Sequence, residues 1–455
     1  MRDMGSEGSK MNEFGDSTLD IYLASAGTGK TSTLLNIIDN HIKEGTPLER
    51  IAFVTFTKKG AEVAQLRTAE MFNASLERLK NFRTIHSMAF RGCSASRNIM
   101  MDFQKYKDFG EKAGYNFGTL GLDTAEGIDW AEMKDQQLVA LEQLYRNNRP
   151  YCEQIMEDRC NYGDLVQYMQ LYVRYKKTFG YLDFTDLLEQ YIAKDLFEDV
   201  DIVCLDEMQD SSLLQWQLVF KAFRNAKHIY AAGDIKQAVF TYAGASCDTL
   251  LKLKGEQHML DRSYRVPSRI LSFAQHIVDE MQTTDHSRCQ AVHEGGSVEE
   301  ITCLDELNNM FDTSKTYFFL ARNKKFFNKY IEWCRENGIP YKVKGEPIFT
   351  NTDKLEFREG KTDDWDADKL DFARYCYRKG TFYQDPIINI STVHTVKGDE
   401  ADIVVLMSDI SRAVSSQLDM DPDSEHRVFY VAVTRAKEKL IIVQPQTRMY
   451  YPYLF

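Results

Sequence analysis

The feature that most constrains the fold is an apolar segment, residues 21–23, followed by a glycine-containing loop and then by residues 32–38, where apolar side chains recur at helical spacing. The first segment predicts the end of a buried strand, and the second predicts a helix. The loop between them has the sequence Ala24-Ser25-Ala26-Gly27-Thr28-Gly29-Lys30-Thr31. Because glycines let backbone N–H groups and a helix N-terminus face an anion, this order predicts a phosphate-binding loop.

The side chains of this loop suit a nucleoside triphosphate. Lys30 would reach the β and γ phosphates, and the Thr31 hydroxyl would bind Mg²⁺. The strict motif has one more glycine at the start of the loop, where this chain has Ala24 or Ser25. The alternative, a turn without a ligand, is disfavoured by the Gly-Lys-Thr ending. The predicted cofactor-binding residues of the loop are Ala26, Gly27, Thr28, Gly29, Lys30 and Thr31.

A second apolar segment, residues 201–205, ends in paired carboxylates, Asp206 and Glu207. In a chain with a phosphate loop, the first carboxylate would hold Mg²⁺ and the second would polarise the attacking water. A further predicted strand, residues 228–234, precedes Gln237, which could sense the γ-phosphate. The alternative, capping carboxylates and a surface glutamine, is disfavoured because the strand ends, their order and their spacing agree.

Other polar and aromatic side chains follow predicted strand ends. Phe56 lies at the end of one such strand, where an aromatic ring could stack on a base. His86 lies in a stretch whose hydroxyl and imidazole groups could contact a backbone phosphate. Core packing for Phe56 and a structural role for His86 are the alternatives.

Length and composition set the remaining bounds. A chain of 455 residues predicts two or three domains. The formal net charge of −12 argues against a generally basic nucleic-acid binder, although a motor can confine positive charge to one groove. Nine cysteines without a Cys-x-x-Cys pair argue against a zinc or iron–sulfur site and favour a reduced, cytoplasmic compartment. We expect no membrane association and a disordered leader at residues 1–18.

Residues 93–180 predict long helices without strand-like runs, and hence a helical insertion. Within it, residues 172–177 alternate aromatic and basic side chains, which suits either a single nucleic-acid strand or a solvated helix face. Asp183 is a predicted helix cap where the chain returns to the first domain.

Eight motifs stand in an order that resembles that of the UvrD/Rep/PcrA-like superfamily 1 DNA helicases. They occupy residues 26–31, 54–59, 84–87, 206–210 with Gln215, 233–245, 263–265, 392–398 and 430–436. The resemblance covers residues 19–444. It implies an α/β fold with two RecA-like P-loop NTPase domains built on parallel sheets, ATP in the cleft between them and a helical insertion in the first.

The resemblance also implies a division of the chain. The first RecA-like domain would comprise residues 19–92 and 181–257, the helical insertion residues 93–180, and the second RecA-like domain residues 258–455. The family has a large second accessory domain, called 2B, between the motifs at Arg265 and Thr392. Here that interval has room for little more than the RecA-like domain itself, and residues 351–385 would stand in for 2B. We therefore expect a reduced motor.

Individual roles follow from the same resemblance. In the first domain, Lys30, Thr31, Asp206, Glu207 and Gln237 would take the roles given above. In the second domain, Tyr264 would stack on adenine, and Arg265 and Arg435 would act as arginine fingers. Gly398 and Glu400 belong to the motif that contacts the ribose. The predicted DNA contacts are Phe56, Thr57, His86, Phe240, Tyr242, Thr392 and His394.

We therefore expect an ATP-dependent DNA helicase and translocase that uses ATP and Mg²⁺, moves 3′→5′ on single-stranded DNA and acts at duplex junctions in replication or repair. The alternative is a DNA-stimulated ATPase that displaces bound protein without unwinding. Two departures from the family are that its adenine-reading glutamine is not visible and that residues 242–245 lack an expected cation. Near the C-terminus, Tyr450 and Tyr451 would either form a wedge at the fork or cover the sheet of the second domain.

Overall fold

The structure is a computed structural model that describes residues 13–117, 134–148, 162–241, 244–285 and 287–455. These residues form two compact units. Of the described residues, the first unit contains 13–24 and 29–260, and the second contains 25–28 and 261–455. The fold class predicted from the sequence, α/β with parallel sheets, is confirmed in both units.

The first unit is built on a six-stranded sheet with the strand order β3-β2-β4-β5-β1-β6. Every neighbouring pair in it is parallel. β2 and β4 are buried along their whole length, as expected for a parallel sheet covered on both faces. The strands are β1 (Thr18–Ala24), β2 (Ile51–Thr55), β3 (Phe82–Thr84), β4 (Ile202–Asp206), β5 (His228–Gly233) and β6 (Glu256–Leu260).

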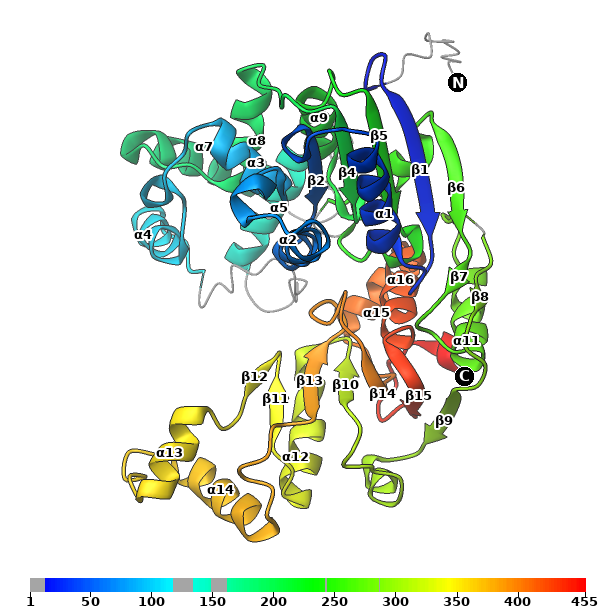
Figure 1. Cartoon of the computed structure of the whole chain (residues 1–455). Coiled ribbons are helices and arrows are strands. Elements are labelled where there is room, and N and C mark those ends of the chain that lie inside the picture. The colour runs from blue at the N-terminus through cyan, green and yellow to red at the C-terminus, as the bar shows by residue number, and fades with distance from the viewer. Residues whose placement is uncertain (1–12, 118–133, 149–161, 242–243, 286) are drawn as a thin grey trace. The chain divides into compact units, whose positions relative to one another are not determined.

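Helices cover both faces of this sheet (Figure 1). On one face, α1 and α2 pack with Phe53 and Cys204, whereas on the other, α3, α8 and α9 pack with Val54 and Val203. The alternation of these side chains along β2 and β4 follows from the two-residue period of a strand. The helices are α1 (Lys30–Lys43), α2 (Lys58–Phe72), α3 (Ile85–Gly92), α8 (Phe184–Ala193), α9 (Leu213–Ala222) and α10 (Cys247–Lys252).

Three helices between α3 and α8 share a core of their own, rich in aromatic rings. They are α4 (Phe103–Ala113), α5 (Lys134–Asn147) and α7 (Tyr162–Phe179). Tyr172 is fully buried there, and its hydroxyl donates to that of Tyr106 at 2.8 Å. In the described part of residues 93–180, the long elements are therefore helices, as the sequence predicts.

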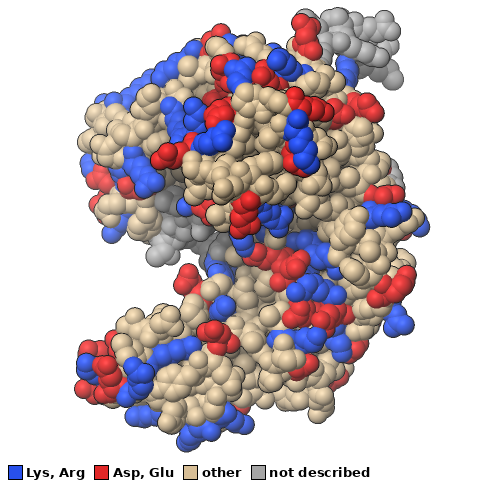
Figure 2. All heavy atoms as spheres, viewed as in Figure 1, with Lys and Arg blue, Asp and Glu red and all other residues tan. Residues whose placement is uncertain are grey.

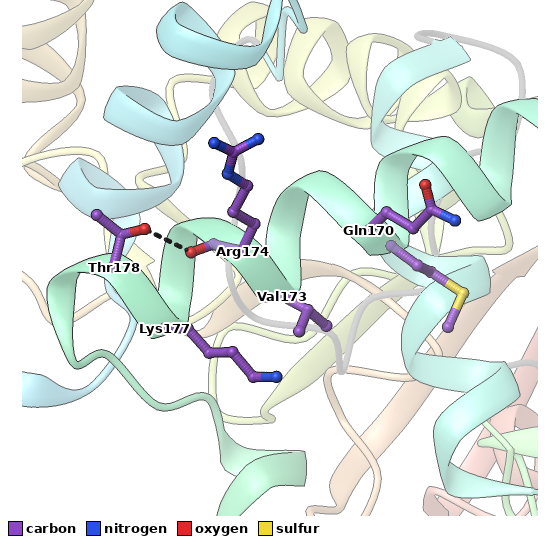
Figure 3. Close-up of a pocket in the computed structure, with 6 residues that line it drawn as sticks. Gln170, Val173, Arg174, Lys177 and Thr178 are labelled. Atoms are coloured by element: carbon purple, nitrogen blue, oxygen red, sulfur yellow. Dashed lines mark hydrogen bonds between the residues drawn. The ribbon is translucent and has the colours of Figure 1, made fainter.

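The hypothesis that residues 172–177 present aromatic rings to a single strand is wrong for Tyr172 and Tyr175, because both lie in this core. Their exposed neighbours line an open hollow of about 590 Å³ on α7 (Figure 3). These neighbours are Val173, Arg174 and Lys177. Residues three or four apart share one side of a helix. A helix with a buried aromatic side and a basic outer side therefore shows the same alternation of aromatic and basic residues as one that binds a nucleic-acid strand.

A buried ionic cluster joins α5, α7 and α8. The Arg146 side chain is 5% exposed and lies 2.6–3.0 Å from four carboxylates. Lys176 of α7 donates to two of them. Asp183 is the N-cap of α8, as predicted, and accepts a hydrogen bond from Asp186 N. The four carboxylates belong to Glu142, Asp183, Asp186 and Glu189. Arg146, Lys176, Glu142 and Asp183 are buried, so each of these charges depends on its partners for compensation, whereas the Glu189 side chain is 41% exposed.

The second unit contains a seven-stranded sheet in the order β12-β11-β13-β10-β14-β15-β9. Its neighbouring strands are parallel, apart from the antiparallel pair β11 and β12. β7 (Arg262–Ser263) and β8 (Gln290–Ala291) form a separate parallel pair. The strands of the large sheet are β9 (Ser297–Ile301), β10 (Tyr317–Ala321), β11 (Tyr341–Val343), β12 (Glu346–Pro347), β13 (Ile388–Thr392), β14 (Ala401–Met407) and β15 (Ala436–Val443).

The interval 351–385 forms two helices of the second unit, α13 and α14. Phe372 of α14 belongs to the buried core of this unit, and Phe357 and Trp365 pack against that core. This interval is therefore packed onto the second unit and has no separate core. The helices of the unit are α11 (Ser268–Asp279), α12 (Phe327–Asn337), α13 (Asn351–Glu359), α14 (Ala367–Lys379), α15 (Arg412–Met420) and α16 (Pro422–Val433).

The aromatic residues near the C-terminus divide into buried and exposed ones. Tyr451 is fully buried, with its ring stacked on Phe429 at a centroid distance of 3.8 Å. Its hydroxyl lies 2.7 Å from His426 Nδ1. Tyr450 is 40% exposed. The wedge hypothesis is therefore wrong for Tyr451, which packs in the core of the second unit, and it stays a prediction for Tyr450.

Among the described residues, no helix is both long and apolar enough to cross a membrane. On the face shown in Figure 2, basic and acidic side chains are interspersed. None of the described cysteines forms a disulfide, namely Cys93, Cys204, Cys247, Cys289, Cys303, Cys334 and Cys376.

We expect Arg146→Leu to lower the free energy of unfolding by about 3–5 kcal/mol, because removal of one cation leaves buried carboxylates uncompensated. Arg174→Leu, which replaces an exposed arginine on α7, should change it by less than about 0.5 kcal/mol. Urea denaturation followed by circular dichroism measures both variants. Equal effects of the two substitutions would contradict a stabilising role for the cluster.

Candidate nucleotide-binding site

The phosphate loop lies between the end of β1 at Ala24 and the start of α1 at Lys30. Gly27 and Gly29 have φ angles of 74° and 79°, a left-handed conformation that glycine adopts without a Cβ clash. Because Gly29 occupies the N-cap, no side chain caps α1. The N–H groups of its first turn have no intrahelical acceptor and are suited to bind an anion.

Lys30 and Thr31 face the carboxylates at the end of β4. Lys30 Nζ lies 3.3 Å from Glu207 Oε1, and the Thr31 hydroxyl donates to Asp206 Oδ2 at 2.6 Å. Burial alone would lower the pKa of Lys30, but attraction to the surrounding carboxylates, Glu207 first, outweighs burial and raises it. Burial, with the neighbouring charge of Glu207, raises the pKa of Asp206 to about 6. A divalent cation bound to the Thr31 and Asp206 oxygens would offset the cost of keeping the buried Asp206 carboxylate ionised. Hydroxyl and carboxylate oxygens are both ligand types that Mg²⁺ takes.

The backbone turns Glu207 back toward Lys30. Its φ of 55° is left-handed, which costs a residue with a side chain about 1–2 kcal/mol. Gln209 then holds the carboxylate in place, donating from Nε2 to Glu207 Oε2 at 2.5 Å. The Oε1 atom of Gln209 accepts from Asp234 N at 3.0 Å, and Gln237 Nε2 donates to Asp234 Oδ2 at 2.5 Å.

A glycine makes this approach possible. Gly233 is the last residue of β5, and a Cβ there would lie 2.8 Å from Gln209 Oε1. The same Cβ would lie 2.5 Å from Leu250 Cδ2. Since real Cβ atoms do not approach so closely, a larger residue at position 233 would displace Gln209 or Leu250.

We call the set Lys30, Glu207, Gln209, Asp234 and Gln237 the contact chain. It joins the carboxyl ends of β1, β4 and β5, which are neighbouring strands of one sheet. The structure thus brings together the predicted catalytic residues Lys30, Asp206, Glu207 and Gln237. Sequence reasoning missed Gln209, whose only signal was its place two residues after the paired carboxylates.

The predicted residues of the second unit lie near its first strand and in the loop after β13. The Tyr264 side chain is 60% exposed, so its ring is accessible for stacking. Arg265 Nε lies 3.9 Å from Glu400 Oε2. Gly398, in the same loop as Glu400, has a φ of 90° that favours glycine.

Arg435, which follows α16, is fully buried. Its guanidinium donates to the carbonyl oxygens of Val431 at 3.1 Å and Asp399 at 3.2 Å. Backbone carbonyls of the second unit therefore hold this guanidinium in one orientation.

Two predicted DNA-contacting aromatics pack on each other. The rings of Phe56 and Phe240 stack with centroids 5.4 Å apart. Phe240 is buried, whereas Phe56 is partly exposed. Thr57 is the N-cap of α2 and accepts from Gly60 N, so its hydroxyl already serves the helix.

The remaining predicted DNA contacts differ in accessibility. His86 packs edge-on against Phe184, and burial lowers the pKa of His86 to about 4, so its ring is neutral near pH 7. Thr392 and His394, at the end of β13, are buried. Tyr242 lies outside the described residues. A neutral His86 would contact DNA by a hydrogen bond or by stacking and not by an ion pair.

Comparison with known proteins gives related matches for both units. Residues 11–258 match the UvrD/REP helicase N-terminal domain, and residues 378–447 match the UvrD-like helicase C-terminal domain. A probable DNA helicase of Mycoplasma pneumoniae is 22% identical over 96% of this chain and 83% of its own length. The ATP-dependent DNA helicase Rep of Escherichia coli is 23% identical over 74% of this chain, which spans 54% of Rep. A probable DNA helicase II homolog of Mycoplasma genitalium is 25% identical, with 40% of its length covered.

We expect Gln209→Leu to lower ATP turnover about 10–100-fold, because a hydrogen bond to a charged group contributes about 1.5–3 kcal/mol. Gln209 positions Glu207, so nucleotide affinity should change little, whereas loss of the acceptor of the buried Asp234 N–H should also lower the melting temperature. Steady-state phosphate release and nucleotide binding measure the two effects separately. Gln217→Leu, an exposed glutamine on α9, is the matched control. Unchanged turnover in Gln209→Leu would remove the positioning role.

Proposed function

Because the chain belongs to the UvrD/REP helicase family, we propose that it couples ATP hydrolysis to 3′→5′ movement on single-stranded DNA and to strand separation at duplex junctions. By family, the enzyme is an ATP-dependent DNA helicase. The observation that carries the proposal is the contact chain. It joins a phosphate-loop lysine to a carboxylate, and that carboxylate to a possible phosphate sensor, Gln237.

The contact chain suggests an order of events. ATP binding would place phosphate oxygens at Lys30, which would leave its ion pair with Glu207. Mg²⁺, held by Thr31 and Asp206, would neutralise charge on the β and γ phosphates. Glu207 would keep its hydrogen bond from Gln209 but would no longer be paired with Lys30. Its carboxylate could then orient the attacking water and accept its proton.

The second unit would supply the remaining charges. Arg265 and Arg435 are proposed to stabilise negative charge that develops on the transferred phosphoryl group, and Tyr264 to stack on adenine. Hydrolysis would then require residues from both units. The motor would therefore change conformation in each cycle of hydrolysis.

The DNA side of the proposal rests on residues that follow the same strand ends. Phe56, which is partly exposed, would stack on a base, and the Phe240 ring would pack against the Phe56 ring and hold it in place. Because Asp234 and Gln237 lie only a few residues before Phe240 and Tyr242, a shift at the γ-phosphate would reach the DNA contacts along a short segment.

We expect Lys30→Ala, Glu207→Gln and Arg435→Ala each to lower DNA-stimulated ATP turnover by about 10²-fold or more, because each removes a group that acts on the transition state. Lys252→Ala, which replaces a 75% exposed lysine at the end of α10, is the control and should retain turnover. Phosphate release with and without single-stranded DNA measures the effect. Absence of DNA stimulation in the wild-type protein would contradict a DNA motor.

Direction and unwinding need a separate measurement. We expect the wild-type protein to unwind a 3′-tailed duplex with ATP and to leave a 5′-tailed duplex intact. The second candidate, protein displacement without unwinding, is favoured by the interval 351–385, which forms only two helices packed on the second unit. ATP-driven displacement of streptavidin from a biotinylated single strand, without release from either duplex, would establish that alternative. Unwinding of the 5′-tailed duplex alone would contradict the proposed direction.

A further inference from the structure

A group of titratable side chains lies at the edge of the first sheet, on strands far apart in sequence. β1 and β6 are neighbouring parallel strands, and β6 is an edge strand (Figure 1). Their register pairs Asp20 with Glu256 and Tyr22 with His258. Because alternate residues of a strand point to the same face, all four side chains share one face of the sheet.

Three of these side chains carry potential metal-ligand atoms that lie close together. One ligand atom from each of Asp20, Glu256 and His258 can be chosen so that all lie within 4.8 Å of one another. His258 Nε2 lies 2.7 Å from Asp20 Oδ1. The Tyr22 ring stacks on the His258 imidazole at a centroid distance of 4.7 Å, and this contact fixes the plane of the imidazole. The site is open to solvent, since the His258 side chain is 33% exposed.

We propose that Asp20, Glu256 and His258 form a binding site for one transition-metal ion of the Zn²⁺ class. Imidazole nitrogen together with carboxylate oxygens suits Zn²⁺, whereas Mg²⁺ and Ca²⁺ take oxygen ligands. Two ligand atoms on one Zn²⁺ lie at most about 4.3 Å apart, since each bond is about 2.0–2.2 Å long. Ion binding would therefore require a small approach of the ligand atoms, for which Glu256, the exposed member of the three, has the most room. Solvent would complete the coordination.

This site is independent of the nucleotide site and shares none of its residues. It also differs from the zinc sites that the cysteine spacing argues against, because it uses no thiolate. The ion would enter as the His258–Asp20 hydrogen bond opens, with the proton on Nε2 passing to solvent or the other ring nitrogen.

The position of the ion gives it a structural effect. Among the described strands, β6 pairs with β1 alone. β1 leads directly into the phosphate loop, and β6 leads through β7 to Tyr264 and Arg265. A metal ion shared by the two strands would hold β6 in register against β1 and so stabilise the strand that precedes each of these motifs.

Zn²⁺ titration of the chelator-treated full chain, by isothermal calorimetry in excess Mg²⁺, tests the site. We expect one equivalent of Zn²⁺ to bind. His258→Gln and Glu256→Gln should each weaken binding at least about tenfold, because loss of even an outer-shell partner costs about 10–100-fold. His276→Gln, at an exposed position on α11, should bind as the wild type does. Circular dichroism would verify that each variant is folded.

A neighbouring pair of histidines provides the decisive comparison. The ring centroids of His41 and His228 lie 5.6 Å apart, and His41 Nε2 lies 2.8 Å from the Tyr230 hydroxyl oxygen. Loss of binding in His41→Asn with full binding in His258→Gln would move the site to that pair and overturn the proposal. Absence of Zn²⁺ binding to the wild type would overturn it as well. Zn²⁺ should also raise the melting temperature of the wild type more than that of His258→Gln, because binding to the folded state stabilises it.

Discussion

The ion pair between Lys30 and Glu207 is the interaction on which the nucleotide site depends. Burial of a lone lysine in the phosphate loop would favour loss of its charge, and burial of a lone glutamate would favour gain of a proton. Burial lowers the pKa of Lys30, but the Glu207 carboxylate 3.3 Å away and the other nearby carboxylates outweigh burial and raise that pKa. The site is thus kept ready for an anion, and the phosphates of a nucleotide would take the place of the Glu207 carboxylate at Lys30.

The parallel sheet explains why so few residues suffice to build this site. β4, β5 and β1 are adjacent and point the same way, so the segments that follow them meet at one edge. Gly233 leaves room for Gln209 to bond both Glu207 and Asp234. Glu207, Gln209 and Asp234 are therefore linked by direct hydrogen bonds.

The sequence was informative where a motif contains both its strand and its chemistry. The phosphate loop, Asp206, Glu207 and the parallel fold could be predicted because apolar runs end directly in the functional residues. The role of Gln209 depends on contacts with residues 233 and 234, which no local pattern records. The burial of Tyr172 and Tyr175 could not be predicted either, since an aromatic side buried in a core and one offered to DNA produce the same alternation. The metal ligands pair only through the register of β1 with β6, more than two hundred residues apart in sequence.

The most direct test of this account is the affinity of Glu207→Gln for a non-hydrolysable ATP analogue with Mg²⁺, measured by fluorescence titration beside the wild type and Lys30→Ala. If Lys30 must leave Glu207 to bind phosphate, removal of the carboxylate charge should keep the affinity equal or raise it up to about tenfold, an effect of about 1.4 kcal/mol. Lys30→Ala should lose affinity. A loss of affinity in Glu207→Gln comparable to that of Lys30→Ala would contradict the account, because Glu207 would then be part of the binding surface itself.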